Sequence, residues 1–216
     1  MRRFVSTGSI VFDVEANIGY YTLLFAKLAG PTGTVHAFEP TSYAFRRLSR
    51  NVALNPGLVS TLALNNVGLL ARPIERDEAI ESQFSQRRPA YSRRESIRFT
   101  TIAEYCETRG IGSIDFLKVD VDGYDEEVVV GGREILERTQ PVVLGEFCDR
   151  VLRDHGTSLE GYVHLYESLG SGRYVKTPDA SPTPLAMLLQ EPDIEDRTVN
   201  AVLLPARYAG RITDRR

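Results

Sequence analysis

Short apolar segments alternate along this sequence with longer segments of helical periodicity, and this alternation constrains the fold more than any other feature. Each apolar segment has the length of a buried strand, and the five clearest are Ile10–Val14, Thr34–Phe38, Val59–Leu64, Ile114–Val119 and Pro141–Phe147. Strands that alternate with helices indicate βαβ units. Nearly continuous apolar strands are typical of a parallel sheet covered on both faces. The sequence therefore predicts an α/β fold with a doubly wound, mostly parallel, Rossmann-like sheet.

Helical spacing of apolar residues predicts the connections between these strands. One helix is expected to open at Gly19 and stop at Gly30, and further helices are expected over 42–55, 102–108, 126–138 and 159–169. Residues 71–96 have no clean period, and we expect a long active-site loop there. The segments 174–176 and 200–204 are expected to pair, with 178–192 as a loop between them. The 216 residues suit a single domain, with its motif-bearing core at about 8–150 and its acceptor-side and C-terminal strands at 151–216.

Charge and composition narrow the classes of partner. The net charge of −3 provides no strong basic field to hold phosphate backbones, so we do not expect a nucleic-acid partner. The two cysteines form no disulfide framework, and no apolar run is long enough to span a bilayer. The N-terminus has no apolar region that a signal peptide needs, so we expect a cytoplasmic protein. A small-molecule or sugar substrate fits these limits, and a homodimer is compatible with them.

In open α/β sheets, ligands bind beyond the carboxyl ends of the strands. The first such end is the bend from Asp13 to Gly19, where Ala16 and Gly19 are small and Asn17 tolerates a left-handed backbone. Small residues let backbone N–H groups approach a ligand at the start of a helix. The bend is also compatible with an ordinary strand-to-helix turn.

The second strand ends at Glu39, about twenty residues after the bend. An acidic side chain there can accept hydrogen bonds from both hydroxyls of an adenosine ribose. A solvated strand end is the alternative. The bend and Glu39 together indicate an adenosine-containing cofactor. The dinucleotide fingerprint GxGxxG is absent, which favours S-adenosylmethionine over a dinucleotide.

Carboxylates also follow the fourth strand, at Asp120, Asp122 and Asp125. Clustered carboxylates repel one another unless a cation lies nearby. The candidate cations are a sulfonium, the ammonium of Lys118 or a divalent metal, and we predict no dedicated metal site. Asp120 is alternatively a general base for a substrate hydroxyl, and Asp122 and Asp125 are alternatively helix caps.

Two further candidates for substrate contact follow the fifth strand. Glu146 lies at the end of that strand, beside the expected position of Asp120, and His155 lies in the loop beyond it. Either side chain can accept a proton from a hydroxyl. The alternative for His155 is a plain surface residue.

Four motifs together resemble those of the FkbM-type methyltransferases. They are the segment from Asp13 to Thr22, the tetrapeptide from Ala37 to Pro40, the helix end from Asn51 to Asn55, and the segment from Asp115 to Gly123. Their order and spacing match over about residues 8–150. The resemblance implies a class I methyltransferase fold, S-adenosylmethionine as methyl donor and hydroxyl groups on secondary metabolites or glycans as acceptors.

The resemblance also implies roles for individual residues. The methionine part of the cofactor would be surrounded by Asp13, Ala16, Asn17 and Gly19, the ribose would bind Glu39, and the adenine would lie near Asn66 and Val67. Asp120 would face the sulfonium and the acceptor.

Glu15 departs from this pattern, because the family has glycine at its position. Its carboxylate would approach the cofactor, and repulsion from the cofactor's own carboxylate at about 4 Å would amount to roughly 1–4 kcal/mol. The Glu15 side chain alternatively turns to solvent or meets the cofactor's amino group. The departure also allows a weakened or inactive copy that serves as a binding or scaffold protein. An in-line O-methyl transfer, with Asp120, Glu146 or His155 as base, is our expectation, and a nicotinamide-dependent oxidoreductase is the remaining alternative.

Overall fold

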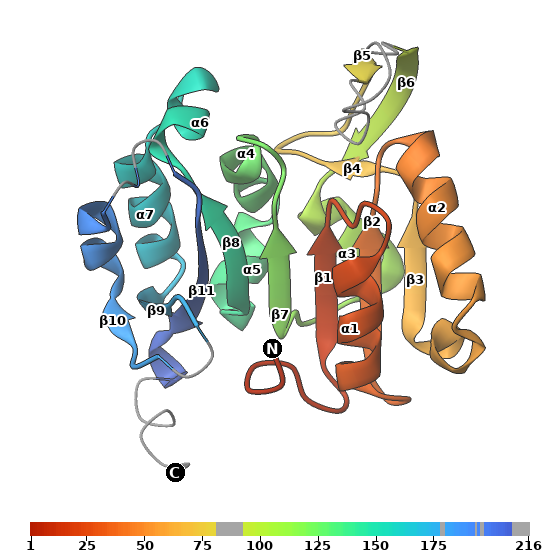
Figure 1. Cartoon of the computed structure of the whole chain (residues 1–216), viewed down its shortest axis with the longest axis horizontal. Coiled ribbons are helices and arrows are strands. Elements are labelled where there is room, and N and C mark those ends of the chain that lie inside the picture. The colour runs from red at the N-terminus through yellow and green to blue at the C-terminus, as the bar shows by residue number, and fades with distance from the viewer. Residues whose placement is uncertain (81–92, 178–179, 193, 195–196, 209–216) are drawn as a thin grey trace.

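An eight-stranded sheet crosses the computed structural model, which describes residues 1–80, 93–177, 180–192, 194 and 197–208 (Figure 1). The strand order is β10-β9-β11-β8-β7-β1-β2-β3. The bounds of these strands are β1 (Ile10–Val14), β2 (Thr34–Phe38), β3 (Leu62–Asn65), β7 (Phe116–Val119), β8 (Val142–Phe147), β9 (Ser171–Val175), β10 (Thr183–Pro184) and β11 (Val199–Pro205).

The sheet is parallel from β3 to β8, and β11 pairs antiparallel with both β8 and β9. From β1 the chain first builds outward through β2 and β3, and it then returns to place β7 on the other side of β1. The strand order therefore reverses between β1 and β7. In open α/β sheets this reversal opens a crevice at the carboxyl ends of the two strands.

Successive residues of β1 face opposite sides of the sheet and pack into different apolar clusters. Val11 packs with Phe25 of α1 (Tyr20–Ala29), whereas Phe12 packs with residues of helices on the other face. The first face also carries α2 (Ser42–Ala53). The second face carries α3 (Ile102–Arg109), α4 (Asp125–Val130), α5 (Arg133–Thr139) and α7 (Leu159–Ser168), while α6 (Asp149–Asp154) follows β8. Coverage of both faces confirms the predicted doubly wound α/β fold.

Several predicted elements differ in their bounds; the fourth strand, for example, begins at Phe116 rather than Ile114. The third strand begins at Leu62 rather than Val59, because a 3-10 helix over Pro56–Thr61 precedes it. The helix predicted over 126–138 is two helices, α4 and α5, separated at Gly131 and Gly132. A Cβ on Gly131 would lie 2.2 Å from the carbonyl oxygen of Leu70. The break therefore reflects a close backbone approach that the helical periodicity of the sequence does not report.

The prediction of a loop over 71–96 is wrong for the described part of that segment. Three strands, β4 (Gly68–Leu69), β5 (Ile74–Ile80) and β6 (Arg93–Thr100), form a second sheet in the order β4-β6-β5. Residues 81–92 lie outside the described residues. The segment predicted as a loop over 178–192 contains β10 and a 3-10 helix over Leu185–Gln190, and residues 178–179 are likewise not described. Charged residues dominate β5 and β6, so neither strand shows an apolar period.

Candidate active site

The bend between β1 and α1 is shaped by left-handed backbone at three positions. The φ angles are 58° at Glu15, 51° at Asn17 and 93° at Gly19. Gly19 is required twice over, because a Cβ there would also lie 2.6 Å from Cδ1 of Leu48. The N–H of Ala16 donates to the carbonyl oxygen of Phe38 at 2.8 Å. The bend is thereby fixed against the end of β2.

Glu39, at the end of β2, lies directly against this bend. Its Oε2 accepts a hydrogen bond from the N–H of Asn17 at 2.9 Å, and its Oε1 accepts from the N–H and Oγ1 of Thr41 at 2.9 and 2.6 Å. The residue is 2% exposed. Burial raises the pKa of the Glu39 carboxyl, although the hydrogen bonds from Thr41 and Asn17 act in the opposite direction. The structure therefore brings together the two features from which the sequence indicated an adenosine pocket.

Asn66 and Val67 follow β3, next to Glu39. The side-chain amide of Asn66 donates to the carbonyl oxygens of Glu39 and Pro40 at 2.9 and 3.0 Å. Val67 is partly buried against the apolar cluster on the second face of the sheet. Asn66 thus orients the backbone that carries Glu39, and the adenine contact of both residues stays a prediction.

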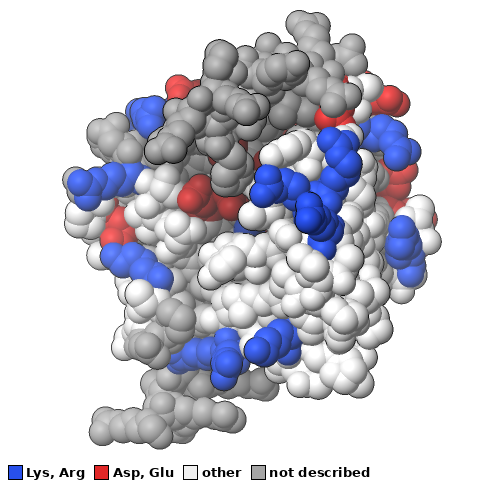
Figure 2. Space-filling model, turned by 45° about the vertical axis from the view of Figure 1, so that its right-hand side comes forward, with Lys and Arg blue, Asp and Glu red and all other residues white. Residues whose placement is uncertain are grey.

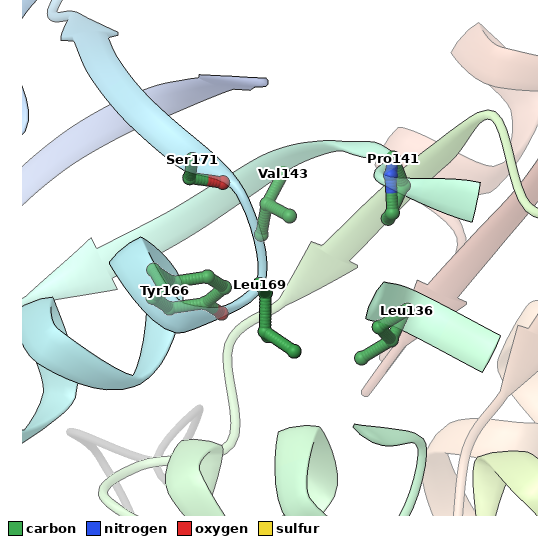
Figure 3. A pocket seen from close by; sticks show the side chains of 6 residues that line it. All are labelled: Leu136, Pro141, Val143, Tyr166, Leu169 and Ser171. Carbon is green, nitrogen blue, oxygen red and sulfur yellow. The ribbon is translucent and has the colours of Figure 1, made fainter. Parts of the chain in front are cut away.

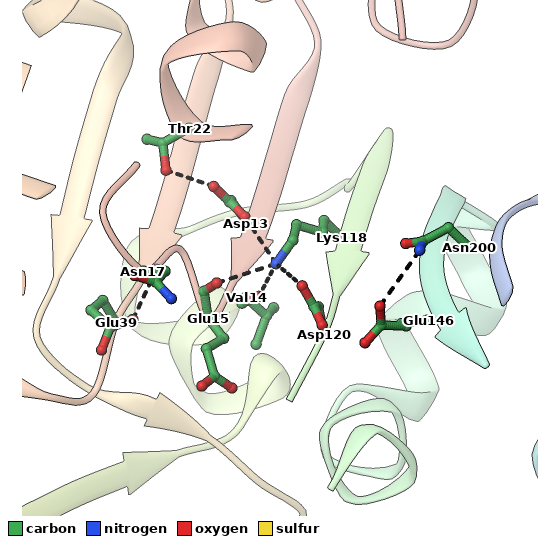
Figure 4. A network of polar contacts seen from close by, with 10 residues as sticks. All are labelled: Asp13, Val14, Glu15, Asn17, Thr22, Glu39, Lys118, Asp120, Glu146 and Asn200. Atoms are coloured by element: carbon green, nitrogen blue, oxygen red, sulfur yellow. Dashed lines mark hydrogen bonds and ion pairs between the residues drawn. The ribbon is translucent and has the colours of Figure 1, made fainter. Parts of the chain in front are cut away.

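A buried ion network lies between β1 and β7, on the side of the bend that faces the sheet (Figure 4). Asp13 is 0% exposed, and its Oδ2 accepts from Oγ1 of Thr22 at 2.6 Å. The Nζ of Lys118 lies 3.7 Å from Oδ1 of Asp13 and 3.2 Å from Oδ2 of Asp120. It also donates to the carbonyl oxygens of Val14 and Glu15 at 3.1 and 3.2 Å. Lys118 therefore ties β1, the bend and the start of the acidic turn together.

The pKa values of this network follow from burial and charge. Burial raises the pKa of Asp13, and the ammonium of Lys118 offsets part of that rise. Burial alone would lower the pKa of Lys118, but the charges of Asp13 and Asp120 outweigh it and raise the value. Lys118 is therefore protonated at neutral pH.

Asp120 and Glu146 stand at the ends of the neighbouring strands β7 and β8. The Asp120 side chain is 41% exposed, and Lys118 holds one of its oxygens. Glu146 is partly buried, and its Oε1 lies 3.5 Å from Nδ2 of Asn200 on β11. Burial raises the pKa of Glu146, and the negative charge of Asp120 raises it further. Among the described contacts, Asp120 thus has the ammonium of Lys118 as a partner, whereas Glu146 has no ammonium beside it.

His155 directly follows α6 as its C-cap residue and is exposed. Its Nδ1 lies 3.0 Å from the carbonyl oxygen of Val151, and its ring packs edge-on against Tyr124 at 4.7 Å between centroids. A Cβ on Gly123 would lie 2.3 Å from Nδ1 of His155. The imidazole therefore covers the turn that follows Asp120. Among the described contacts, His155 touches neither Asp120 nor Glu146.

The two remaining carboxylates of the turn differ from each other. Asp125 is the first residue of α4, and its Oδ2 accepts at 3.1 Å from the N–H of Gly123, which lies before the helix. The N-cap residue is Tyr124, so neither Asp122 nor Asp125 is the cap that the sequence allowed. Burial raises its pKa to about 6. Asp122 is exposed and has a left-handed backbone with φ of 47°.

Three contacts of the site were not predicted from the sequence. Thr22 and Thr41 bind the carboxylates of Asp13 and Glu39, and Asn200 approaches Glu146 from a strand far along the chain. Thr41 had a local signal, because it precedes a helix in the manner of an N-cap residue. Asn200 had none, since only the pairing of β11 with β8 brings it to Glu146.

The charge of the crevice tests whether S-adenosylmethionine fits it. Among the described contacts, one ammonium, that of Lys118, lies near the crevice. Five carboxyl side chains surround the crevice, and they are Glu15, Glu39, Asp120, Asp122 and Glu146. Burial raises the pKa of Glu15 to about 8, with further contributions from Glu39 and Asp122. Such an environment favours a cationic ligand and repels a pyrophosphate. The residues present therefore fit a sulfonium cofactor better than a dinucleotide.

Other ligand sites are less well supported. Within the described residues, no group of three or more His, Cys, Asp or Glu side chains is arranged to hold a metal ion. A cavity at the opposite, amino end of β8 is apolar and of about 10 Å³, room for no more than one water (Figure 3). Its lining residues are Leu136, Pro141, Val143, Tyr166, Leu169 and Ser171. No helix in the described part of the chain has both the length and the apolar character that crossing a membrane requires.

Comparison with known sequences points to one family. The sequence matches the family described as Methyltransferase FkbM domain over residues 13–168. It is 28% identical to the 31-O-demethyl-FK506 methyltransferase FkbM of Streptomyces tacrolimicus, over 69% of this chain and 72% of that protein. The matched span contains the bend, Glu39, Asp120 and Glu146.

Solved structures agree on the fold. Methyltransferase FkbM from Methylobacillus flagellatus superposes with a TM-score of 0.55 at 16% identity, over 77% of this chain and 38% of that one, so this chain spans well under half of its length. A putative methyltransferase from Streptococcus mutans, solved in complex with SAH, superposes with a TM-score of 0.54 at 10% identity, over 94% and 91% of the two chains. At these identities the likeness shows the class I methyltransferase fold.

Proposed function

The chain belongs to the FkbM methyltransferase domain family, and from this premise we propose that it transfers a methyl group from S-adenosylmethionine to a hydroxyl group. The acceptor class we propose is a small molecule, a secondary metabolite or a sugar. One observation carries the proposal: the Glu39 carboxylate is hydrogen-bonded to the β1–α1 bend at the point where strand order reverses. An adenosine ribose binds at this position of the fold when an acidic side chain ends the second strand.

The contacts proposed for the cofactor run along the crevice from Glu39 to Asp120, and Figure 4 shows Asn17 and Glu15 between these two residues. The ribose hydroxyls donate to Glu39, and Asn66 and Val67 border the adenine. The methionine part lies along the bend that includes Ala16 and Asn17. Asp13 and Gly19 act indirectly by fixing the bend, since Asp13 is fully buried and Gly19 closes the bend against Leu48. Asp120 faces the sulfonium.

When bound, S-adenosylmethionine supplies a methyl group that is already activated for in-line transfer. The protein is then left with two tasks, which are to align the acceptor oxygen and to remove its proton. We assign the role of general base, which accepts the proton of the acceptor hydroxyl, to Glu146 rather than to Asp120. The ammonium of Lys118 lies 3.2 Å from Asp120 and occupies one of its oxygens, whereas burial and the charge of Asp120 raise the pKa of Glu146, which makes Glu146 the better proton acceptor. His155, exposed at the end of α6, is proposed only as a contact at the rim.

A small-molecule or sugar acceptor is proposed over a nucleic acid, together with a cytoplasmic location. The net charge of −3 and two buried cysteines that form no disulfide support these choices. One surface feature runs against them, because Arg46, Arg47 and Arg50 are exposed on α2 and basic side chains gather on that face of the molecule (Figure 2). RNA binding that weakens steeply with salt and is lost when these three arginines are changed to glutamine would overturn the choice of acceptor.

Isothermal titration of the purified chain with S-adenosylmethionine, SAH and NADH tests the proposed function. We expect binding of the first two ligands and none of NADH. Transfer of a labelled methyl group to hydroxyl-bearing metabolites and glycosides is the second readout. If NADH binds and S-adenosylmethionine does not, the protein is an oxidoreductase. If neither binds, it is a scaffold that retains only the fold.

A further inference from the structure

Glu15 is an unusual residue for the place it occupies. Its backbone is left-handed, with φ of 58°, a conformation that residues with a side chain rarely adopt. Its carbonyl oxygen accepts a hydrogen bond from Nζ of Lys118 at 3.2 Å, which holds the backbone in this conformation. The side chain points the other way, away from Lys118 and toward the space between Glu39 and Asp120 (Figure 4). The strained backbone thus presents a carboxyl group to the crevice.

Three other carboxyl groups lie near the Glu15 carboxyl. Glu39 approaches from the end of β2, and Asp120 and Asp122 approach from the turn after β7, while Lys118 of β7 is the nearby cation. Within the described residues, no hydrogen-bond donor or ion-pair partner contacts the Glu15 carboxyl, and it is partly buried. The Glu15 carboxyl therefore has no ion-pair partner among the described residues, and a cationic ligand in the crevice can provide one.

We propose that Glu15 makes the crevice selective for charge, so that it favours the cationic methyl donor over the neutral thioether product. The inference rests on the proposed function, because it concerns the same crevice. The inference adds to the proposed function, since it assigns to Glu15, the residue that departs from the family pattern, a role in determining ligand specificity. The donor and the product share the adenosine and the amino acid, and they differ by the methyl group and one positive charge at sulfur.

Glu15 exchanges its proton with solvent as the charge at sulfur changes. Without ligand, Glu15 retains its proton at neutral pH, because burial and the charges of Glu39 and Asp122 raise its pKa to about 8. A cation within about 4–6 Å lowers the pKa of a carboxyl by roughly 1–3 units, so donor binding releases the proton to solvent. When the methyl group leaves, sulfur becomes neutral and Glu15 takes a proton from solvent again. The proton of the acceptor hydroxyl passes separately to Glu146.

Calorimetry in two buffers with different ionisation enthalpies tests the proposal, because it measures proton release together with affinity. We expect roughly half a proton to one proton released per S-adenosylmethionine at about pH 7, and none per SAH. In Glu15→Gln, which keeps the size of the side chain, proton release is lost. The ratio of donor to product affinity at about pH 9, where Glu15 of the free protein is ionised, falls about tenfold or more.

Two further variants make the result decisive. Glu160→Gln removes an exposed carboxylate on α7, far along the chain from the crevice, and is expected to leave both proton release and the affinity ratio unchanged. Glu15→Gly relieves the left-handed strain and should lose proton release and selectivity as Glu15→Gln does, which guards against misfolding of the latter. If either Glu15 variant binds the donor more tightly, or the affinity ratio is unchanged, the inference is overturned. A wild-type protein that binds neither ligand instead contradicts the proposed function.

Discussion

Asp13, Glu39 and Lys118, around the bend, are each 3% exposed or less, whereas the side chain of Asp120, just beyond the carboxyl end of β7, is 41% exposed. We call the first group the cofactor half of the crevice. The acceptor half consists of Asp120, Glu146, His155 and Asn200. In the cofactor half, hydrogen bonds of 2.6 to 3.2 Å hold the bend and its carboxylates. In the acceptor half, Glu146 and Asn200 are 3.5 Å apart and His155 is exposed.

The difference indicates which ligand each half is built for. Buried side chains held by hydrogen bonds and ion pairs are preorganised, and preorganisation suits a ligand that is the same in every turnover. An open half with few internal bonds leaves polar groups available to an acceptor. On this account, changes in the cofactor half should affect stability and donor affinity, and changes in the acceptor half should affect turnover.

Lys118→Met is expected to have the largest effect. Removing one partner from a buried ion pair leaves the other charge uncompensated, which destabilises a protein by about 3–5 kcal/mol. For a chain of this length that corresponds to a fall in Tm of roughly 10 °C, measurable by thermal unfolding. The double variant Asp13→Asn/Lys118→Met should recover part of the loss, since the uncompensated carboxylate is also gone. A Tm unchanged by Lys118→Met would mean that the cofactor half is not held by this network.

Glu146→Gln should act on turnover instead. Loss of a general base lowers kcat by about 10²–10⁴, and we expect the affinity for S-adenosylmethionine to stay within about twofold of wild type because Glu146 lies in the acceptor half. Steady-state methyl transfer to an accepted substrate and calorimetry measure the two effects. If Asp120→Asn lowers kcat more than Glu146→Gln does while donor affinity is unchanged, Asp120 is the base.

Glu39→Gln should weaken the binding of both S-adenosylmethionine and SAH. A hydrogen bond to a charged group contributes about 1.5–3 kcal/mol, so we expect the affinity for S-adenosylmethionine to fall roughly tenfold to hundredfold. The affinity for SAH should fall by the same factor, because the ribose is common to both. A fall for one ligand alone would assign Glu39 to the sulfur end of the crevice rather than to the ribose.

Glu15→Gln is expected to change the pH dependence of stability by a smaller amount. The carboxyl has its ordinary pKa of 4.5 in the unfolded chain and a pKa of about 8 in the folded protein. Between these values the folded protein holds a proton that the unfolded chain has lost, so the stability of the wild type falls as pH rises from 4.5 through 8. The variant lacks this loss, and its Tm should exceed that of the wild type by a few degrees at about pH 9 and match it at about pH 4. Equal Tm values at both pH values would show that Glu15 is not held in an acidic, buried setting.

The cofactor half was largely predictable from the sequence, and the reason is local. The bend and Glu39 each follow an apolar strand directly, and parallel strands bring their carboxyl ends to one edge of the sheet. Asp120 and Glu146 were placed at neighbouring strand ends by the same reasoning. The conformation of Glu15 was left open, because a left-handed backbone at a residue with a side chain follows from the contact with Lys118 and not from its own sequence.

The parts that were not predicted depend on contacts between distant segments. The strands β5 and β6 carry few apolar residues, so their pairing has no period to reveal it. The split between α4 and α5 depends on the approach of Gly131 to Leu70. Asn200 reaches Glu146 only because β11 inserts antiparallel between β8 and β9.

A crystal structure of the complex with SAH would test the central claim most directly. We expect both ribose hydroxyls to lie at hydrogen-bond distance from the Glu39 carboxylate, about 2.7 Å, with the thioether sulfur between Glu15 and Asp120. A nucleoside bound elsewhere, or a Glu15 side chain that fills the crevice while Glu39 keeps only its contacts with Asn17 and Thr41, would contradict the account.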